Sequence, residues 1–117
     1  MAAPVVHFEI HGKDGKQLQD FYSKLFSWTV DANNPMQYGM VSDAGVGGGI
    51  TAGDAAMVTV YVEVPDLDAA LKQAGSLGGQ TVSGPMEVPG GPTIAMFKDP
   101  QGNTIGLIKA GSMQAAG

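Results

Sequence analysis

Cysteine and arginine are both missing from the 117 residues of this chain. Without cysteine the sequence excludes disulfides, thiolate nucleophiles and cysteine-based zinc or iron–sulfur sites. The six basic residues are all lysines, and 11 acidic residues bring the formal net charge to -5. An acidic chain without arginine lacks the bidentate phosphate ligand and the basic surface that nucleic-acid binding requires. We therefore expect neither nucleic acid nor an anionic membrane surface as a partner.

Long apolar runs are missing as well. No stretch approaches the roughly 18 residues of a membrane-spanning helix. The opening residues MAAPVVHFEI lack the basic segment and long apolar run of a signal peptide. Together with the absence of cysteine, this favours a cytoplasmic protein. The 44% share of apolar residues and the chain length predict a single domain over residues 1–117.

The chain contains an internal repeat. Residues 5–11 (VVHFEIH) and residues 58–64 (VTVYVEV) both alternate with a period of two, which is typical of strands. At one constant offset between the two segments, Glu9 corresponds to Glu63. Two short strands can look alike by chance, so the repeat depends on whether the residues that follow them also agree.

A helix is expected after each of these strands. Asp14 is a favourable N-cap with Gln17 three residues later, and Pro65 and Asp66 open the second helical segment. Apolar side chains then recur at helical spacing in both segments. Three short strand-like runs separated by turn residues follow each helix: near 27–31, 36–41 and 46–51, and near 80–88, 93–98 and 103–109.

The resulting order is βαβββ, twice, in units of about 1–53 and 56–117. This order predicts an α+β fold in which each helix covers one face of a four-stranded sheet. We expect the two mixed sheets to form a cup-shaped half-barrel with the helices outside. Polar side chains on the concave face would then mark a ligand site.

With these features the sequence resembles the vicinal oxygen chelate superfamily, the group of glyoxalases, bleomycin-resistance proteins and extradiol dioxygenases. The opening strand VVHFEI, the helix QLQDFYSKLFSW and the closing run FKDPQGNTIGLI carry the resemblance together with the duplicated βαβββ order. The Asp-Pro-x-Gly sequence in the closing run also has its own physical reason, because proline fixes φ and glycine accepts a positive φ in a tight turn.

The resemblance implies a metal site with four facing positions, one on the first and one on the last strand of each unit. His7 matches the first position, whereas Tyr61 and Gly106 stand at the two positions of the second unit. The last strand of the first unit offers only glycine and isoleucine around residues 48–50. A catalytic metal needs about three N or O ligands from the protein. We therefore expect no cofactor, and we keep as an alternative a divalent metal held by His7, Glu9, Glu63 and Tyr61.

The polar residues of the two similar strands allow two interpretations. His7 could work with Glu9 or Glu63 as general acid and base, or the two glutamates could make structural hydrogen bonds.

The glycine run at residues 45–49 suggests a phosphate loop, but no helix and no lysine follow it as a phosphate loop requires. A glycine-rich strand that another group approaches closely is the better interpretation.

The hypothesis for the function has two forms. The first is a metal-independent binding module for a small, mostly apolar or amphipathic molecule. The second is a lyase, isomerase or dioxygenase-type enzyme that uses His7 with Glu9 and Glu63.

The resemblance also implies a homodimer, with residues 53–56 as a hinge between the units. Six side chains are expected to frame the ligand pocket: Trp28, Tyr38, Met40, Tyr61, Met96 and Phe97.

Overall fold

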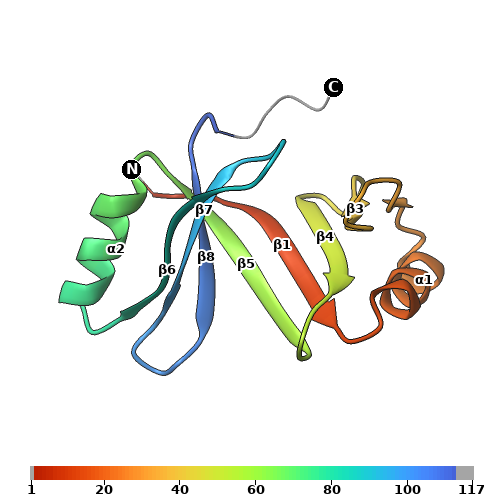
Figure 1. Cartoon of the computed structure of the whole chain (residues 1–117), viewed down its shortest axis with the longest axis horizontal. Coiled ribbons are helices and arrows are strands. Elements are labelled where there is room, and N and C mark those ends of the chain that lie inside the picture. The colour runs from red at the N-terminus through yellow and green to blue at the C-terminus, as the bar shows by residue number, and fades with distance from the viewer. Residues whose placement is uncertain (1, 113–117) are drawn as a thin grey trace. The chain divides into compact units, whose positions relative to one another are not determined.

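The computed structural model describes residues 2–112 (Figure 1). The C-terminal residues AGSMQAAG, whose small and polar side chains predict a frayed tail, lie mostly outside this range. Each βαβββ set contains one helix, three further strands and both parallel and antiparallel strand pairs. The predicted α+β class and the duplicated order are therefore confirmed. The structure divides into two compact units, one of residues Val6–Val60 and one of Met1–Val5 with Tyr61–Gly117.

The unit Val6–Val60 holds a sheet with the strand order β2-β3-β4-β1. The chain runs through β1 (Val5–Gly12), α1 (Gly15–Phe26), β2 (Val30–Asp31), β3 (Gly39–Val41) and β4 (Gly47–Ala52). Strand β1 pairs in parallel with β4, and β3 is antiparallel to both β4 and β2.

The two ends of α1 follow from local sequence. The Asp14 carboxylate accepts a hydrogen bond from the Gln17 N–H at 3.0 Å, which confirms the predicted N-cap. The helix ends at Ser27, whose φ of 59° is left-handed. Because the chain turns there, the strand expected near 27–31 is reduced to two residues.

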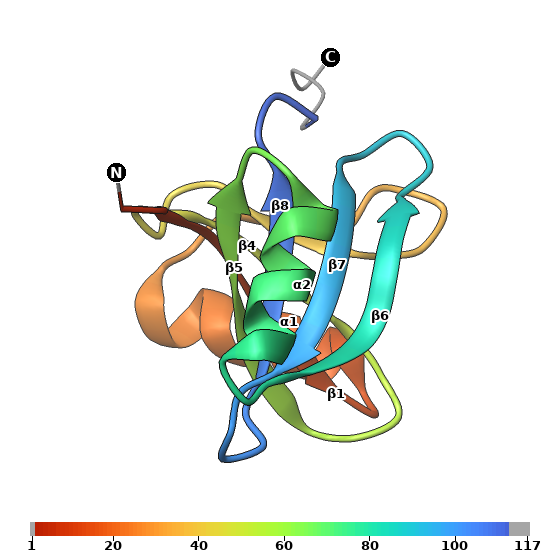
Figure 2. The same ribbon diagram turned by 90° about the vertical axis from the view of Figure 1, so that its left-hand side faces the viewer.

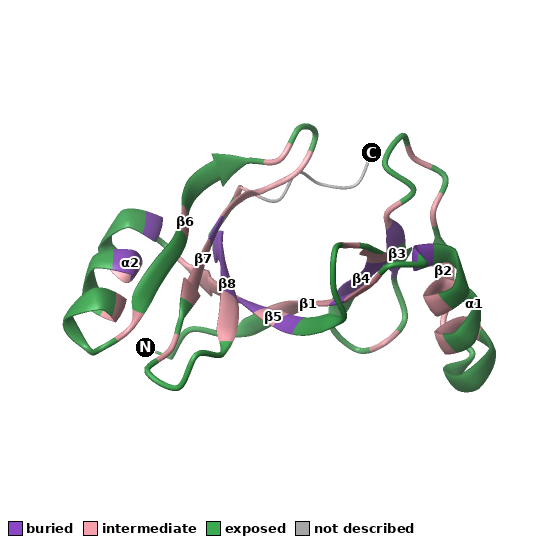
Figure 3. Ribbon diagram, turned by 60° about the horizontal axis from the view of Figure 1, so that its bottom comes forward, coloured by how far each residue is buried: buried purple, intermediate pink, exposed green. Residues whose placement is uncertain are grey.

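The core of this unit lies between the sheet and α1. Ile10, Val41 and Ile50 are its buried residues, and Figure 3 shows the buried positions on β3 and β4. Partly buried apolar side chains pack around them: Phe8, Leu18, Tyr22, Trp28, Val30 and Ala44. Alternation along β1 places Phe8 and Ile10 in this core, and it leaves His7, Glu9 and His11 on the opposite face of the strand.

The second unit repeats this plan with the strand order β5-β8-β7-β6. Its strands are β5 (Met57–Val64), β6 (Gln80–Glu87), β7 (Thr93–Lys98) and β8 (Thr104–Lys109), and β5 begins four residues before the boundary of the unit. Helix α2 (Leu67–Ser76) lies across one face of these strands (Figure 2).

The core of the second unit lies under α2. Leu67 and Leu71 of the helix pack against Ala95 and Leu107 of the sheet. The Asp66 carboxylate caps the helix by accepting a hydrogen bond from the Ala69 N–H at 3.0 Å.

The closing turn has the structural role that its sequence predicts. Asp99 Oδ1 accepts hydrogen bonds from the N–H groups of Gln101 and Asn103, each at 2.9 Å. Gly102 has a φ of +92°, which favours glycine. Hydrogen bonds from Asn103 lower the pKa of the Asp99 carboxyl below its usual value. The Asp-Pro-x-Gly-Asn segment is therefore the turn that sets the strand pairing of β7 with β8.

Candidate functional site

Four polar side chains of the unit Val6–Val60 form one hydrogen-bonded network. The Tyr38 hydroxyl lies 2.8 Å from His7 Nε2 and 2.8 Å from Glu9 Oε2. The other carboxylate oxygen of Glu9 lies 2.9 Å from His11 Nε2. Three members come from alternate positions of β1, and Tyr38 comes from the segment that leads into β3. Tyr38 thus joins an acid and a base on a face that the core does not use.

The chemistry of the network fixes where its protons lie. Tyr38 has one hydroxyl proton and donates it to Glu9. The contact between His7 and Tyr38 therefore requires that His7 Nε2 carries a proton and donates it to the Tyr38 oxygen. Glu9 accepts from Tyr38 on one oxygen and from His11 on the other. The result is a carboxylate whose two oxygens are both engaged by donors.

Burial controls the charge of His7. Its side chain is 12% exposed. Removal from water lowers the pKa of His7 below the usual 6.5, against an opposing and smaller effect of the Glu9 carboxylate. His7 is therefore neutral at pH 7, in agreement with its donor role toward Tyr38.

This shift predicts a loss of stability in acid. Between the lowered pKa and about 6.5, the unfolded chain takes up a proton at His7 that the folded protein does not. The free energy of unfolding should therefore fall as the pH drops through that interval, and His7→Gln should reduce the fall. Denaturant unfolding at pH 7.5 and pH 5.0 measures both. An equal pH dependence in the wild type and the variant would contradict this assignment.

The segment 32–38 is built to present Tyr38. The side-chain amide of Asn34 accepts a hydrogen bond from the Tyr38 N–H at 2.9 Å and donates one to the Tyr38 carbonyl at 2.8 Å. Gln37 adopts a left-handed φ of 53°, which costs free energy in a residue other than glycine. Gln19 of α1 ties this turn to the sheet by donating to the carbonyls of Gln37 and Ile50. This turn also explains why the strand expected near 36–41 begins only at Gly39.

Close contacts with neighbouring rings explain the glycines at residues 48 and 49. Residues 47–49 lie inside β4, so the run opens no helix and is not a phosphate loop. A Cβ at Gly49 would overlap the Tyr38 hydroxyl, and a Cβ at Gly48 would overlap the Phe8 ring. The side chains of this unit therefore take the space that β4 leaves open on both of its faces.

The positions that the resemblance assigns to a metal do not fit one. His7 pairs with Gly47 across β1 and β4, and Tyr61 pairs with Gly106 across β5 and β8. A Cβ at Gly106 would overlap the Tyr61 ring, so this position has no room for the carboxylate of metal-dependent relatives. Within residues 2–112, no group of three or more His, Asp or Glu side chains is arranged to hold a metal.

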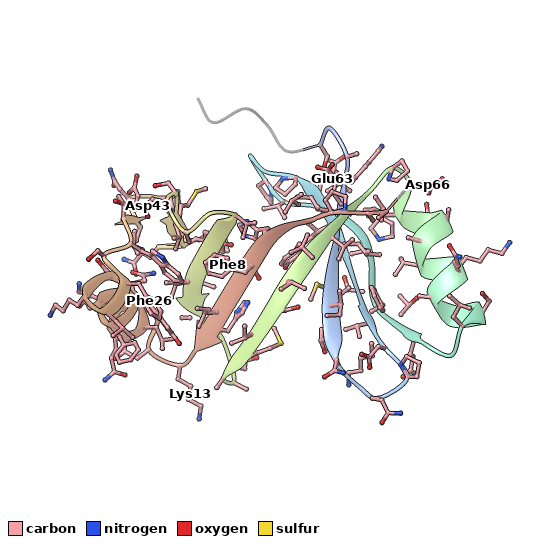
Figure 4. The ribbon with its side chains drawn as sticks, turned by 180° about the vertical axis from the view of Figure 1, so that it is seen from behind. Phe8, Lys13, Phe26, Asp43, Glu63 and Asp66 are labelled. Carbon is pink, nitrogen blue, oxygen red and sulfur yellow. The ribbon has the colours of Figure 1, made fainter. Side chains whose placement is uncertain are left out.

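The remaining predicted site residues have varied surroundings. The ring centroid of Trp28 lies 5.5 Å from that of Phe8 and 5.0 Å from that of Phe26, and both phenylalanines are labelled in Figure 4. Trp28 belongs to the core beneath α1. Met40 is 52% exposed. In the other unit Tyr61 is buried, Phe97 packs against the core beneath α2, and Met96 and Glu63 are half-buried.

Three further residues contribute to the site. His11 lies with His7 and Glu9 on the polar face that the period of β1 predicts. Gly49 belongs to the glycine run for which the sequence predicts a close approach by another group, without indicating which group. Asn34 carries no such signal, because its role depends on the path of a loop. None of the described helices is long and apolar enough to cross a membrane.

Comparisons with known proteins agree with this fold. The family model described as a glyoxalase-like domain matches residues 7–108. The anthracycline biosynthesis protein DnrV of Streptomyces peucetius is 28% identical over 93% of this chain. The alignment covers 48% of DnrV, so the chain spans about half the length of this curated relative.

Solved structures share the fold at low sequence identity. The hypothetical protein BH1468 from Bacillus halodurans C-125 has a TM-score of 0.72 and 12% identity, with full coverage of both chains. The Mn(II)-bound glyoxalase from Novosphingobium aromaticivorans has a TM-score of 0.69 and 15% identity over 99% of this chain and 42% of its own.

Proposed function

This chain belongs to the glyoxalase-like domain family, and we propose that it binds a small organic molecule without a metal ion. The observation that carries the proposal is the network of His7, Tyr38, Glu9 and His11. It supplies polar groups of fixed direction on a sheet face, as ligand sites do. Gly106 at one position that holds metal in the family, and only glycine and isoleucine around the corresponding position on β4, support a site that works by hydrogen bonding alone.

The kind of ligand follows from the composition of this face. Neutral His7 and the carboxylate of Glu9 offer directional hydrogen bonds, and the exposed thioether of Met40 offers an adaptable apolar surface nearby on β3. These groups suit an amphipathic molecule with an apolar body and a polar substituent. The relative DnrV is named as an anthracycline biosynthesis protein, and anthracyclines are small organic compounds. Its name therefore supports the same class of ligand.

Elemental analysis and calorimetry test the metal-independent character. We expect tag-free protein to contain no stoichiometric metal, and we expect titration with Zn²⁺, Ni²⁺, Mn²⁺ or Fe²⁺ to give no heat of site binding. His7→Ala is the matched variant, because only His7 matches a ligand position of the family. Near-stoichiometric metal in the wild type that His7→Ala removes would overturn the proposal.

A second candidate is an acid–base enzyme, and the Tyr38 hydroxyl between His7 and Glu9 favours it. A hydroxyl that accepts from one group and donates to the other provides a path for a proton. Turnover of a bound compound that is lost in both His7→Gln and Glu9→Gln, while binding persists, would support the enzyme. Binding without turnover would support the binding module.

A further inference from the structure

The ring of Tyr38 is held as a bound phenol would be. Its hydroxyl accepts from His7 Nε2 and donates to Glu9 Oε2, each at 2.8 Å. Its ring lies within 12° of parallel to the imidazole of His7, with centroids 6.5 Å apart. Gly49 lies under the hydroxyl end of the ring and has no side chain to obstruct it. The groups on β1 and β4 therefore already form a receptor for an aromatic hydroxyl.

The receptor is selective for a hydroxyl that both accepts and donates. His7 offers a proton and Glu9 offers a lone pair, and both side chains are largely shielded from water, at 12% and 15% exposure. A methyl ether at the same place could accept from His7 but could not donate the hydrogen bond that Glu9 Oε2 receives from the Tyr38 hydroxyl. Sites built around a hydroxyl discriminate strongly against analogues that lack it, because a shielded polar group then loses its partner.

Segment 32–38, which supplies Tyr38, is held largely by its own hydrogen bonds. Among the described contacts, residues 32–37 hydrogen-bond mainly within the segment, from Asn34 N–H to the Ala32 carbonyl and from Gln37 N–H to the Asn34 carbonyl. The bond from Gln19 to the Gln37 carbonyl ties the segment to α1. Met36 at its tip is 80% exposed. Outward movement of this segment would break the hydrogen bonds of Tyr38 to His7 and Glu9 and the bond from Gln19, and a phenolic hydroxyl bound in place of Tyr38 would restore the first two.

We propose that the ligand carries a phenolic hydroxyl, which replaces the hydroxyl of Tyr38 between His7 and Glu9, and that segment 32–38 is a lid that withdraws to admit it. This inference rests on the proposed function and names the chemical class of its ligand. Asn34 clamps the backbone of Tyr38 from within the segment, so the lid and its ring leave together.

Removal of the tyrosine side chain tests the receptor directly. Tyr38→Ala should bind p-cresol, the side chain of tyrosine as a free molecule, with a dissociation constant in about the millimolar range expected for so small a ligand. 4-Methylanisole, which cannot donate a hydrogen bond, should bind at least about 10-fold more weakly. Ligand-observed NMR or calorimetry measures both constants. Equal affinity for the two compounds, or binding of neither, would overturn the inference.

Two further substitutions in the Tyr38→Ala background locate the bound phenol. Glu9→Gln should weaken p-cresol binding about 10-fold, because the neutral amide oxygen of glutamine accepts a hydrogen bond more weakly than the carboxylate does. Gly49→Ala should abolish binding, because its methyl group enters the space of the hydroxyl. Gly84→Ala is the matched control, since a Cβ there meets nothing within 4 Å, and it should leave binding unchanged. Unchanged binding in Gly49→Ala would place p-cresol elsewhere and contradict the proposal.

A measurement on the wild type stays informative even if Tyr38→Ala folds poorly. The tethered tyrosine competes at an effective millimolar concentration, so p-cresol, with a dissociation constant in the same range, should bind at least about 2-fold more weakly than to the variant. Binding should shift the ring resonances of Tyr38 as the lid leaves. A compound without a hydroxyl that binds this face, or a phenol that binds it without moving Tyr38, would disprove the inference and leave the proposed binding function intact. Failure of every compound to bind would count against both.

Discussion

Replacement of Ile50 by alanine is expected to lower the free energy of unfolding by about 2–5 kcal/mol. The Ile50 side chain is 0% exposed and belongs with Ile10 and Val41 to the core beneath α1. The cavity cannot collapse easily, because the Ile50 carbonyl is held by Gln19 at 2.8 Å and its strand pairs on both sides. Denaturant unfolding followed by circular dichroism measures the loss.

Val58→Ala is the control for this prediction. Val58 is 69% exposed on β5, so its truncation should change the free energy of unfolding by less than about 0.5 kcal/mol. Similar losses for Val58→Ala and Ile50→Ala would show that the core beneath α1 is not packed as described.

Gly106→Glu should destabilise the protein by about 3 kcal/mol without creating a metal site. The substitution restores the residue type that the family resemblance implies at this position. Gly106 is buried, however, and the Tyr61 ring occupies the space that a new Cβ would need. Tyr61 is itself only 6% exposed, so its ring cannot move aside without disturbing its neighbours. Denaturant unfolding and calorimetric titration with Zn²⁺ measure the two effects.

Two variants sharpen this prediction. The double variant Tyr61→Ala/Gly106→Glu should lose less free energy of unfolding than the two single variants lose together, because removal of the ring makes room for the new side chain. Gly84→Glu, at a position with open space around it, should cost less than about 0.5 kcal/mol. Stoichiometric zinc binding by a stable Gly106→Glu variant would show that Tyr61 does not block the position.

The helix caps and turns could be predicted because each depends on a few neighbouring residues. Asp14 and Asp66 cap their helices through bonds to residues three positions later. Asp99 organises its turn in the same local way. The polar face of β1 also follows from the period of two, although both short strands after α1 are shorter than the sequence predicts. The left-handed Ser27 shortens the first and the turn before Tyr38 shortens the second, and the sequence has no clear sign of either.

The candidate site could be predicted only in part. Strand parity and the family resemblance both indicate His7, and parity alone indicates Glu9, whereas the sequence predicts Tyr38 only as a pocket wall. The hydrogen bonds of Tyr38 join residues 29 and 31 positions apart. Such contacts depend on the register of β1 against β4 and on the path of segment 32–38, and neither is encoded in a local pattern.

By itself the sequence determined the composition limits, the order of the elements, the caps and the side of β1 that stays polar, because these depend on residue type and on short-range periodicity. Only the tertiary structure decided what the glycines are for. Gly48, Gly49 and Gly106 look alike in the sequence, yet each leaves room for a different ring, from Phe8, Tyr38 and Tyr61. At a glycine the sequence shows only that a side chain is absent. Tertiary packing decides which other group fills the space.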